Sequence, residues 1–440
     1  MQNQGIRDAR SLGTPKLLVL GLQHMFAMFG ATVLVPALTG LSVSATLLFA
    51  GLGTLFFHFL TKGKVPAFLG SSFAYLAGYA AIAPNGEAAL LPYACVGVAA
   101  SGLLYLILAA LVHGFGANRV MRFFPPVVTG PIIICIGMTL ANSAINNCTG
   151  SWDIALVAIL TVVIFNIWGK GMLRIIPILL GVLVSYVYAA VTGRVDFSGV
   201  ASAAWIGLPV KMENTVFSLI GNCDANLLVT AIIAIMPIAF ATMIEHIGDI
   251  CAISSTVGAN FIADPGLHRT LLGDGLATTM AGLLGGPANT TYGENTGVLA
   301  LSKIYDPLVI RIAAVLAIIL SFSPKFEAVI NTIPTGIIGG ISFVLYGMIS
   351  AIGVRNVVEN RVDFTNSRNL IVAAVILVCA LGFNSVGGVS FAVAGVTINL
   401  SGLAVAAIAG ILLNAILPGN DYEFDAADGS EAATSSNLQV

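Results

Sequence analysis

Long apolar runs alternate along the chain with short loops that carry most of its charged residues. A membrane-spanning helix needs about 20 apolar residues, and fewer suffice where the segment is broken. Counted in this way, the pattern predicts about 14 membrane segments in an all-helical, multi-pass protein. The segments begin near Lys16, Ala45, Val65, Ala88, Pro126, Asp153 and Leu173, and then near Leu227, Thr270, Pro287, Leu308, Ala328, Leu370 and Leu403.

The segments fall into two sets of seven, separated by a connection of mixed polarity at residues 194–223. We therefore predict a first repeat over residues 16–193 and a second over residues 224–418, flanked by residues 1–15 and by an acidic tail over residues 419–440. Because seven is odd, the second repeat enters the membrane inverted relative to the first. This is the plan of many secondary transporters.

Composition and charge agree with this organisation. Hydrophobic residues make up 58% of the chain and charged residues 9%, whereas soluble domains carry about 25% charged residues. All of the 18 lysines and arginines except Arg194, Lys211 and Lys325 fall in loops on one side. The positive-inside rule then places both termini in the cytoplasm, with the protein in the cell (inner) membrane and surrounded by lipid. The net charge of −2 and the scattered basic residues do not favour a nucleic-acid partner.

The third segment of each repeat differs from the others. Both open with proline and are interrupted by Gly, Ser or Thr before a full helix could form. Non-helical backbone at membrane depth survives only where protein or water satisfies its polar groups. A pair of broken segments at corresponding positions indicates a transporter's binding site. The sequence therefore predicts a site at residues 71–75 and 290–297.

Four acidic residues lie in or beside apolar segments of the second repeat: Glu245, Asp249, Asp274 and Glu294. A carboxylate within the membrane is costly and is by default a candidate for function. Glu245 and Asp249 share one helical face, one turn apart. Two carboxylates so close cannot both ionise cheaply in a dry site, so one is expected to hold a proton. Glu294 belongs to the second broken segment and is expected to face them.

Such a cluster could couple transport to a proton gradient and could also accept hydrogen bonds from a ligand's N–H groups. Backbone amides at Phe73 and Gly293 would donate to the ligand's carbonyls, and Phe73 or Tyr292 could stack on a flat ring. These features suit a planar heterocycle that bears N–H and C=O groups. The sequence carries no hydrolase, nucleotide-binding or metal-ligand motif, so we expect neither an enzyme nor a metal site.

Several residues keep alternative interpretations. Gln23 and His24 could belong to the site or form a structural polar pair. Asp274 could instead pair with Arg269 at the edge of a loop. His246 follows Glu245 but lies on a different helical face, so we predict a packed core histidine there.

Four motifs resemble the nucleobase–ascorbate transporter family, also called nucleobase:cation symporter-2. They are QHMFAMFGATVLVP at residues 23–36, KGKVPAFLGSSFA at 62–74, DPGLHR at 264–269 and NTTYGENTGV at 289–298. The resemblance extends over residues 17–417 and is strongest to the bacterial branch that transports uracil. It implies uracil:proton symport by alternating access, with no cofactor beyond the coupling ion.

The resemblance also implies a fold and a site. Segments 1–4 and 8–11 would form a core domain, segments 5–7 and 12–14 a gate domain, and short antiparallel strands would interrupt segments 3 and 10. Homodimers through the gate domains occur in the family. Uracil would be bound by Glu245 and Glu294, by the backbone at Phe73 and Gly293, and beside Tyr292. Asp249 with the two glutamates would carry the proton, and Gln23, His24, Asn295 and Asp274 would support the site.

Two departures from the uracil-transporting pattern leave an alternative open. Members of that branch often carry His where this chain has Asp249, and Asp249 with Asp274 resembles the purine-transporting branch. That branch, however, has Gln where this chain has Glu294. A symporter of xanthine or another purine is thus the alternative to uracil. An anion exchanger or channel of related fold is less favoured, because the predicted site is acidic.

Overall fold

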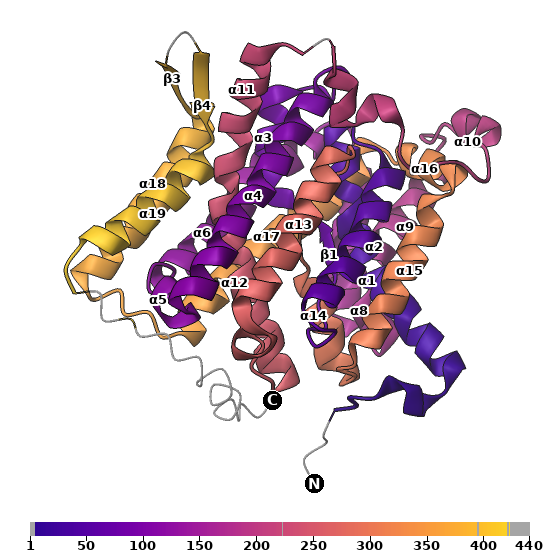
Figure 1. Cartoon of the computed structure of the whole chain (residues 1–440). Coiled ribbons are helices and arrows are strands. Elements are labelled where there is room, and N and C mark those ends of the chain that lie inside the picture. The colour runs from indigo at the N-terminus through magenta and orange to yellow at the C-terminus, as the bar shows by residue number, and fades with distance from the viewer. Residues whose placement is uncertain (1–4, 222, 394–395, 420–421, 423–440) are drawn as a thin grey trace.

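The computed structural model describes residues 5–221, 223–393, 396–419 and 422, and it is mostly helical (Figure 1). The first half contains α1 (Thr14–Thr39), α2 (Val43–Leu60), β1 (Leu69–Ser71), α3 (Leu76–Ile82), α4 (Leu91–Phe115), α5 (Ala117–Met121), α6 (Pro126–Cys148), α7 (Trp152–Trp168), α8 (Met172–Ile175) and α9 (Pro177–Val191). The connection holds α10 (Ser198–Ser202). The second half contains α11 (Ala225–Ile235), α12 (Ala239–Val257), α13 (Leu267–Leu283), β2 (Asn289–Thr291), α14 (Gly293–Ser302), α15 (Pro307–Ser321), α16 (Pro324–Asn331), α17 (Thr335–Glu359), α18 (Ser367–Ser385), β3 (Val389–Val393), β4 (Val396–Leu400) and α19 (Gly402–Ile416).

Local chemistry sets many of these boundaries. Ser42 starts α2 by accepting a hydrogen bond from the Ala45 amide, and Asp224 starts α11 by accepting from the amides of residues 226 and 227. α1 ends at Gly40, whose φ of 80° lies in the left-handed region that glycine adopts without strain. Such caps satisfy backbone groups that helix ends leave without intrahelical partners.

Apolar helices of membrane-spanning length dominate the described part of the chain. Seven are long and apolar enough to cross a bilayer, and α15 with α16, bent by 87°, would make an eighth. Four further apolar helices have 10–17 residues. The protein is therefore a multi-pass membrane protein, as the hydropathy pattern predicts.

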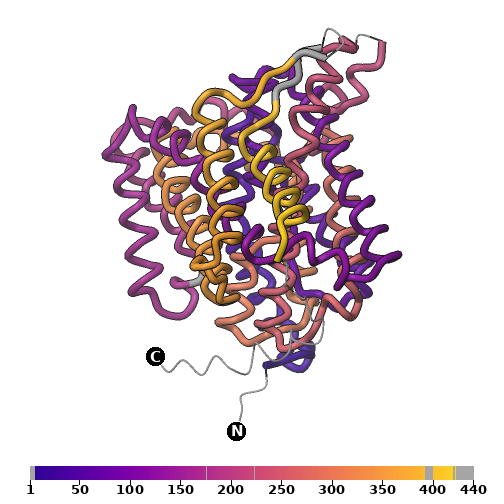
Figure 2. Tube along the Cα trace, turned by 90° about the vertical axis from the view of Figure 1, so that its left-hand side faces the viewer, coloured from indigo at the N-terminus to yellow at the C-terminus, as the bar shows by residue number. Residues whose placement is uncertain are grey.

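The helices pack in two groups. α6, α7, α9, α17, α18 and α19 pack mainly on one another, and the other group contains α1, α2, α4, α11, α12, α13, α14 and α15 with the strands β1 and β2. Figure 2 shows α18 and α19 side by side on the outer face of the first group. Glycines permit close helix contacts: a Cβ at Gly137 would lie 2.2 Å from the Tyr346 carbonyl oxygen, and one at Gly353 would lie 2.5 Å from the Ile134 nitrogen.

The two halves of the chain meet in a short sheet near the centre. β1 and β2 pair antiparallel, with Leu69 opposite Thr291 and Ser71 opposite Asn289. Side-chain hydroxyls satisfy further backbone amides, since Leu69 N donates to Thr54 Oγ1 (2.9 Å) and Asn289 N donates to Thr278 Oγ1 (3.2 Å). In this way the backbone can leave the helical conformation while its polar groups remain paired. A helical turn at Phe73–Tyr75 follows β1, and α14 follows β2.

Some boundaries differ from the sequence prediction. The segment expected to begin near Ala328 begins instead at Thr335, because Ser323 starts the separate helix α16 and Pro334 lies in extended backbone before α17. The hairpin of β3 and β4, which stands beside α11 in Figure 1, was not predicted at all. The predicted acidic tail at residues 419–440 lies almost entirely outside the described residues.

Candidate functional site

A cavity of about 270 Å³ lies between the two helix groups. One wall comes from α12, α14 and the broken segments, and the opposite wall comes from α9 and α17. Its lining includes the predicted site residues Phe73, Glu245, Asp249, Tyr292, Gly293 and Glu294. Because ligand pockets span roughly 300–1,000 Å³, this volume suits a small ligand.

Helix α12 supplies two of the three carboxylates. It begins after a bend at Met236–Ile238, where Pro237 interrupts the helix that started at Ala225. Glu245 and Asp249 then lie one turn apart, and both line the cavity. The Oε2 atom of Glu245 is buried, and no described residue hydrogen-bonds to it, so its capacity as an acceptor is unused.

The third carboxylate, Glu294, is placed by the change from strand to helix. It is the second residue of α14, directly after Gly293. The first amides of a helix have no intrahelical acceptors, and they favour negative charge nearby. The same holds for the helical turn that begins at Phe73. Two helix starts, at Phe73 and Gly293, therefore border the cavity together with Glu294.

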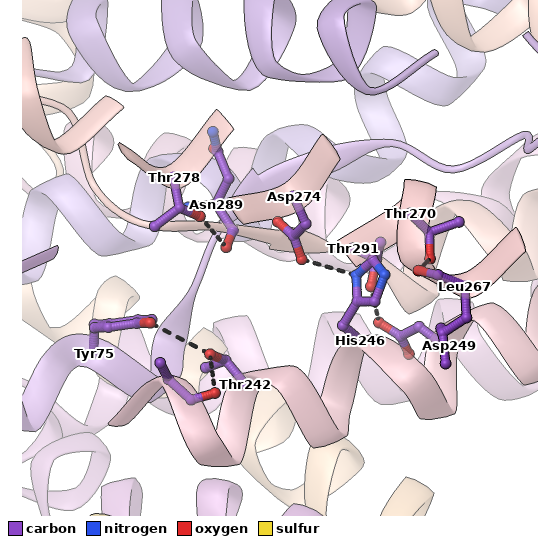
Figure 3. Close-up of polar contacts among 11 residues, drawn as sticks. Tyr75, Thr242, His246, Asp249, Leu267, Thr270, Asp274, Thr278, Asn289 and Thr291 are labelled. Carbon is purple, nitrogen blue, oxygen red and sulfur yellow. Dashed lines mark hydrogen bonds and ion pairs between the residues drawn. The ribbon is translucent and has the colours of Figure 1, made fainter. Parts of the chain in front are cut away.

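Asp249 and Tyr292 are fixed by hydrogen bonds to the strands. Thr291 Oγ1 donates to Asp249 Oδ2 over 2.6 Å, which joins α12 to β2 (Figure 3). The Tyr292 hydroxyl donates to the Ser71 carbonyl oxygen over 2.9 Å. Thr32 Oγ1 in turn donates to the Tyr292 hydroxyl over 3.4 Å. The ring of Tyr292 is thereby held across the strand pair.

Of the predicted supporting residues, His24 and Asn295 come together. Asn295 Nδ2 donates to the His24 carbonyl oxygen (3.1 Å) and lies 3.2 Å from His24 Nδ1, which connects α14 to α1. Gln23 is buried on α1 but does not line the cavity, whereas Phe26 and Ala27 do.

Asp274 does not pair with Arg269, so that alternative is wrong. Arg269 Nη1 donates to the Leu60 carbonyl oxygen, while Asp274 lies in the middle of α13. Its partner is His246: Asp274 Oδ2 is 2.8 Å from His246 Nδ1, and both side chains are 0% exposed (Figure 3). His246 is a packed core residue, as predicted, but its contact with Asp274 is not predicted by the sequence.

The sequence also missed part of the cavity wall. The opposite side consists largely of apolar residues of α9 and α17, such as Leu179, Leu345 and Met348, and Arg174 and Asn166 also contribute. Apolar residues that face a cavity have the same hydropathy as those that face lipid, so no sequence signal could have found them. Within the described residues, no cluster of three or more His, Cys, Asp or Glu could hold a metal ion.

Comparisons with known proteins match this chain to permeases. The model of the Permease family (Xan_ur_permease) matches residues 15–412. The chain is 43% identical over 425 residues to the uracil permease of Bacillus caldolyticus, covering 94% of each protein. It is 40% identical to the uracil permease of Bacillus subtilis (strain 168), covering 94% of this chain and 95% of that one. To the putative pyrimidine permease RutG of Escherichia coli (strain K12) it is 39% identical, covering 91% and 89%.

Solved structures share the fold at low sequence identity. The transmembrane domain of a cyanobacterium bicarbonate transporter, BicA, matches with a TM-score of 0.64 and 16% identity, over 87% of this chain and 98% of that one. SLC26A9 matches with a TM-score of 0.64 and 11% identity, over 91% and 64%. These two matches show that the chain shares its fold with both proteins.

Proposed function

The chain belongs to the Permease family, and from this premise we propose that it imports uracil across the cell (inner) membrane. The observation that carries the proposal is the cavity of about 270 Å³ between the two helix groups, lined by Glu245, Glu294 and the helix starts at Phe73 and Gly293. Uracil permeases at 40–43% identity over nearly the whole chain support the choice of substrate. The protein is a transporter rather than an enzyme.

The chemistry of uracil matches these groups. Its ring carries two N–H donors and two carbonyl acceptors. Glu245 and Glu294 would accept from the N–H groups, and the free amides at Phe73 and Gly293 would donate to the carbonyls. Tyr292, whose ring is fixed by its bond to Ser71, would lie alongside the base. Hydrogen bonds to a charged group contribute about 1.5–3 kcal/mol each, so the two carboxylates would supply much of the specificity.

The mechanism that we propose is alternating access. Fourteen segments in two inverted repeats would form a core domain (segments 1–4 and 8–11) and a gate domain (segments 5–7 and 12–14). The two helix groups that flank the cavity support this division. Movement of one group against the other would open the cavity to either side in turn. Both termini would be cytoplasmic, and two copies would associate through their gate domains.

Protons are the proposed coupling ion. Glu245, Asp249 and Glu294 share one cavity, and the described lining holds one cation, Arg174. Carboxylates crowded into a poorly hydrated space favour the uptake of a proton. Protonation while the site faces outward and release while it faces inward would drive uracil import. Asp249, held by Thr291, occupies the position at which uracil-transporting relatives often carry His.

One observation favours a second candidate, a xanthine or purine symporter. The pair of acids at positions 249 and 274 is typical of the purine-transporting branch. Asp274, however, lies against His246 and does not line the cavity, whereas Glu294 does. Glu294 would therefore decide the substrate, in favour of uracil. Anion transport is disfavoured because three carboxylates line the cavity.

The test is uptake of radiolabelled uracil by cells that lack their own uracil transporter, with unlabelled uracil, thymine, xanthine and uric acid as competitors. We expect uracil to compete best, and Glu294→Gln to abolish uptake while the protein remains folded and inserted. Uptake by that variant at the wild-type rate would refute the assignment. Dissipating the proton gradient is expected to stop uptake; transport that persists on a sodium gradient alone would refute proton coupling.

A further inference from the structure

The close contact between His246 and Asp274, 2.8 Å from Nδ1 to Oδ2, lies behind the site and has no role in the mechanism above. His246 directly follows Glu245, and consecutive residues of an α-helix point about 100° apart. Glu245 faces the cavity, whereas His246 points into the core toward α13, as Figure 3 shows for the histidine. The pair is completely buried.

Close packing confines the pair. The His246 ring has edge contacts with Phe57 (centroids 6.4 Å apart) and Tyr105 (6.3 Å). Asp274 is flanked by two glycines at which α13 approaches α2 and α4 closely. A Cβ at Gly273 would lie 2.8 Å from Phe57 Cδ2, and one at Gly275 would lie 2.4 Å from Tyr105 Cβ. The carboxylate and the imidazole therefore have little space in which to separate.

The contacts of α12 on either side of His246 also limit the rotation of this helix about its axis. Thr242, one turn earlier, lies 3.3 Å from the Tyr75 hydroxyl, and Asp249, about one turn later, accepts from Thr291. α12 is thus held at three successive places, and the middle one is the contact between His246 and Asp274. A rotation of the helix that moved Glu245 away from the cavity would separate His246 from Asp274 and leave two buried polar groups without a partner, which is unfavourable.

We propose that His246 is a positioning residue for Glu245: by pairing with Asp274 it fixes the rotation of α12 and so aims the substrate carboxylate into the cavity. This inference rests on the proposed role of Glu245 as a uracil ligand. His246 itself does not touch the substrate.

The first test compares His246→Leu, Asp274→Leu and the double variant His246→Leu/Asp274→Leu, with Ser255→Ala, an exposed position on the same helix, as control. His246→Leu leaves the buried Asp274 side chain without its polar partner, so we expect the KM for uracil to rise about tenfold or more. The double variant replaces the pair by apolar groups and should recover a large part of that loss. The control should match the wild type. Thermal unfolding of the purified variants reports stability separately.

If the contact between His246 and Asp274 only stabilised the fold, the variants would change the unfolding temperature but not the KM. If the unfolding temperature falls while the KM of the folded protein stays within about twofold of the wild type in every variant, the proposal is overturned. Should His246→Leu fail to fold, His246→Asn takes its place, because its amide nitrogen can occupy the position of Nδ1. That variant is expected to keep KM near the wild-type value, and a KM as high as that of a Glu245 variant would also overturn the proposal.

A second readout needs no substrate. In a background without other reactive thiols, Glu245→Cys reports by its rate of labelling with a small, membrane-permeant maleimide whether position 245 faces the cavity. We expect that rate to fall severalfold when His246→Leu is added, and an unchanged rate would overturn the inference. If the wild type does not bind uracil, the proposed function fails, and the labelling experiment still decides the role of His246.

Discussion

Gly70 lies where β1 crosses the ring of Tyr292, and replacing it by alanine should disturb the site without removing any polar group. A Cβ at this position would lie 2.3 Å from Tyr292 Cζ and 2.4 Å from Cε2. Non-bonded carbons prefer separations of about 3.5–4.0 Å, so the strand and the ring would have to move apart by about 1 Å or more. The ring cannot yield easily, because its hydroxyl donates to the Ser71 carbonyl oxygen at 2.9 Å.

The expected cost follows from this geometry. Inserting a methyl group into a well-packed core costs about 1–3 kcal/mol of stability. Tyr292 directly precedes Gly293 and Glu294, so its displacement is transmitted to the proposed ligands. A shift of about 1 Å at a binding or reacting centre can lower activity by roughly 100-fold. We therefore expect Gly70→Ala to lower uracil uptake at least tenfold and to lower the thermal unfolding temperature moderately.

Uptake of radiolabelled uracil and thermal unfolding of the purified protein measure the two effects. The matched control is Gly347→Ala on α17, where an added Cβ would have no atom within 4 Å. The control should transport and unfold like the wild type. Gly70→Ala with wild-type KM, Vmax and unfolding temperature would show that the strand pair adapts freely and does not hold the site, which would refute the reasoning.

Three further predictions concern other contacts. Thr291→Val removes the donor to Asp249 and is expected to reduce uptake by about tenfold, measured as Vmax/KM at fixed expression; an unchanged ratio would mean that this bond does not matter for transport. Gly353→Ala places a Cβ 2.5 Å from the backbone of α6, so the unfolding temperature should fall in fluorescence-monitored melting. Outside the membrane segments, Lys64 holds the pKa of Asp264 below its ordinary value of 3.8, so the ion pair stabilises the protein above that pH and loses its effect as the pH falls further. The small difference in unfolding temperature between wild type and Asp264→Asn should accordingly disappear on acidification, and a difference that grows would contradict this account.

Much of the architecture could be predicted because hydropathy and helix-breaking residues are local signals. The broken segments were found from proline followed by small and polar residues, and the spacing of Glu245 and Asp249 placed both on one helical face. The pairing of Asp274 was missed because Arg269, five residues away, was the nearest opposite charge in sequence. His246 and Asp274 meet only when α12 packs beside α13, and no pattern within either segment encodes that contact.

The separation of the two central strands in sequence has a consequence for biosynthesis. Residues 69–71 enter the membrane early, but the strand that pairs with them, residues 289–291, is made only after most of the chain has been inserted. Thr54 of α2 can bond to the Leu69 amide before then. The backbone groups that pair with β2 need water or transient partners until it arrives, because a bilayer offers none. The substrate site therefore cannot form progressively as segments leave the ribosome. The site forms in one late step, when β2 of the second half pairs with β1 of the first half.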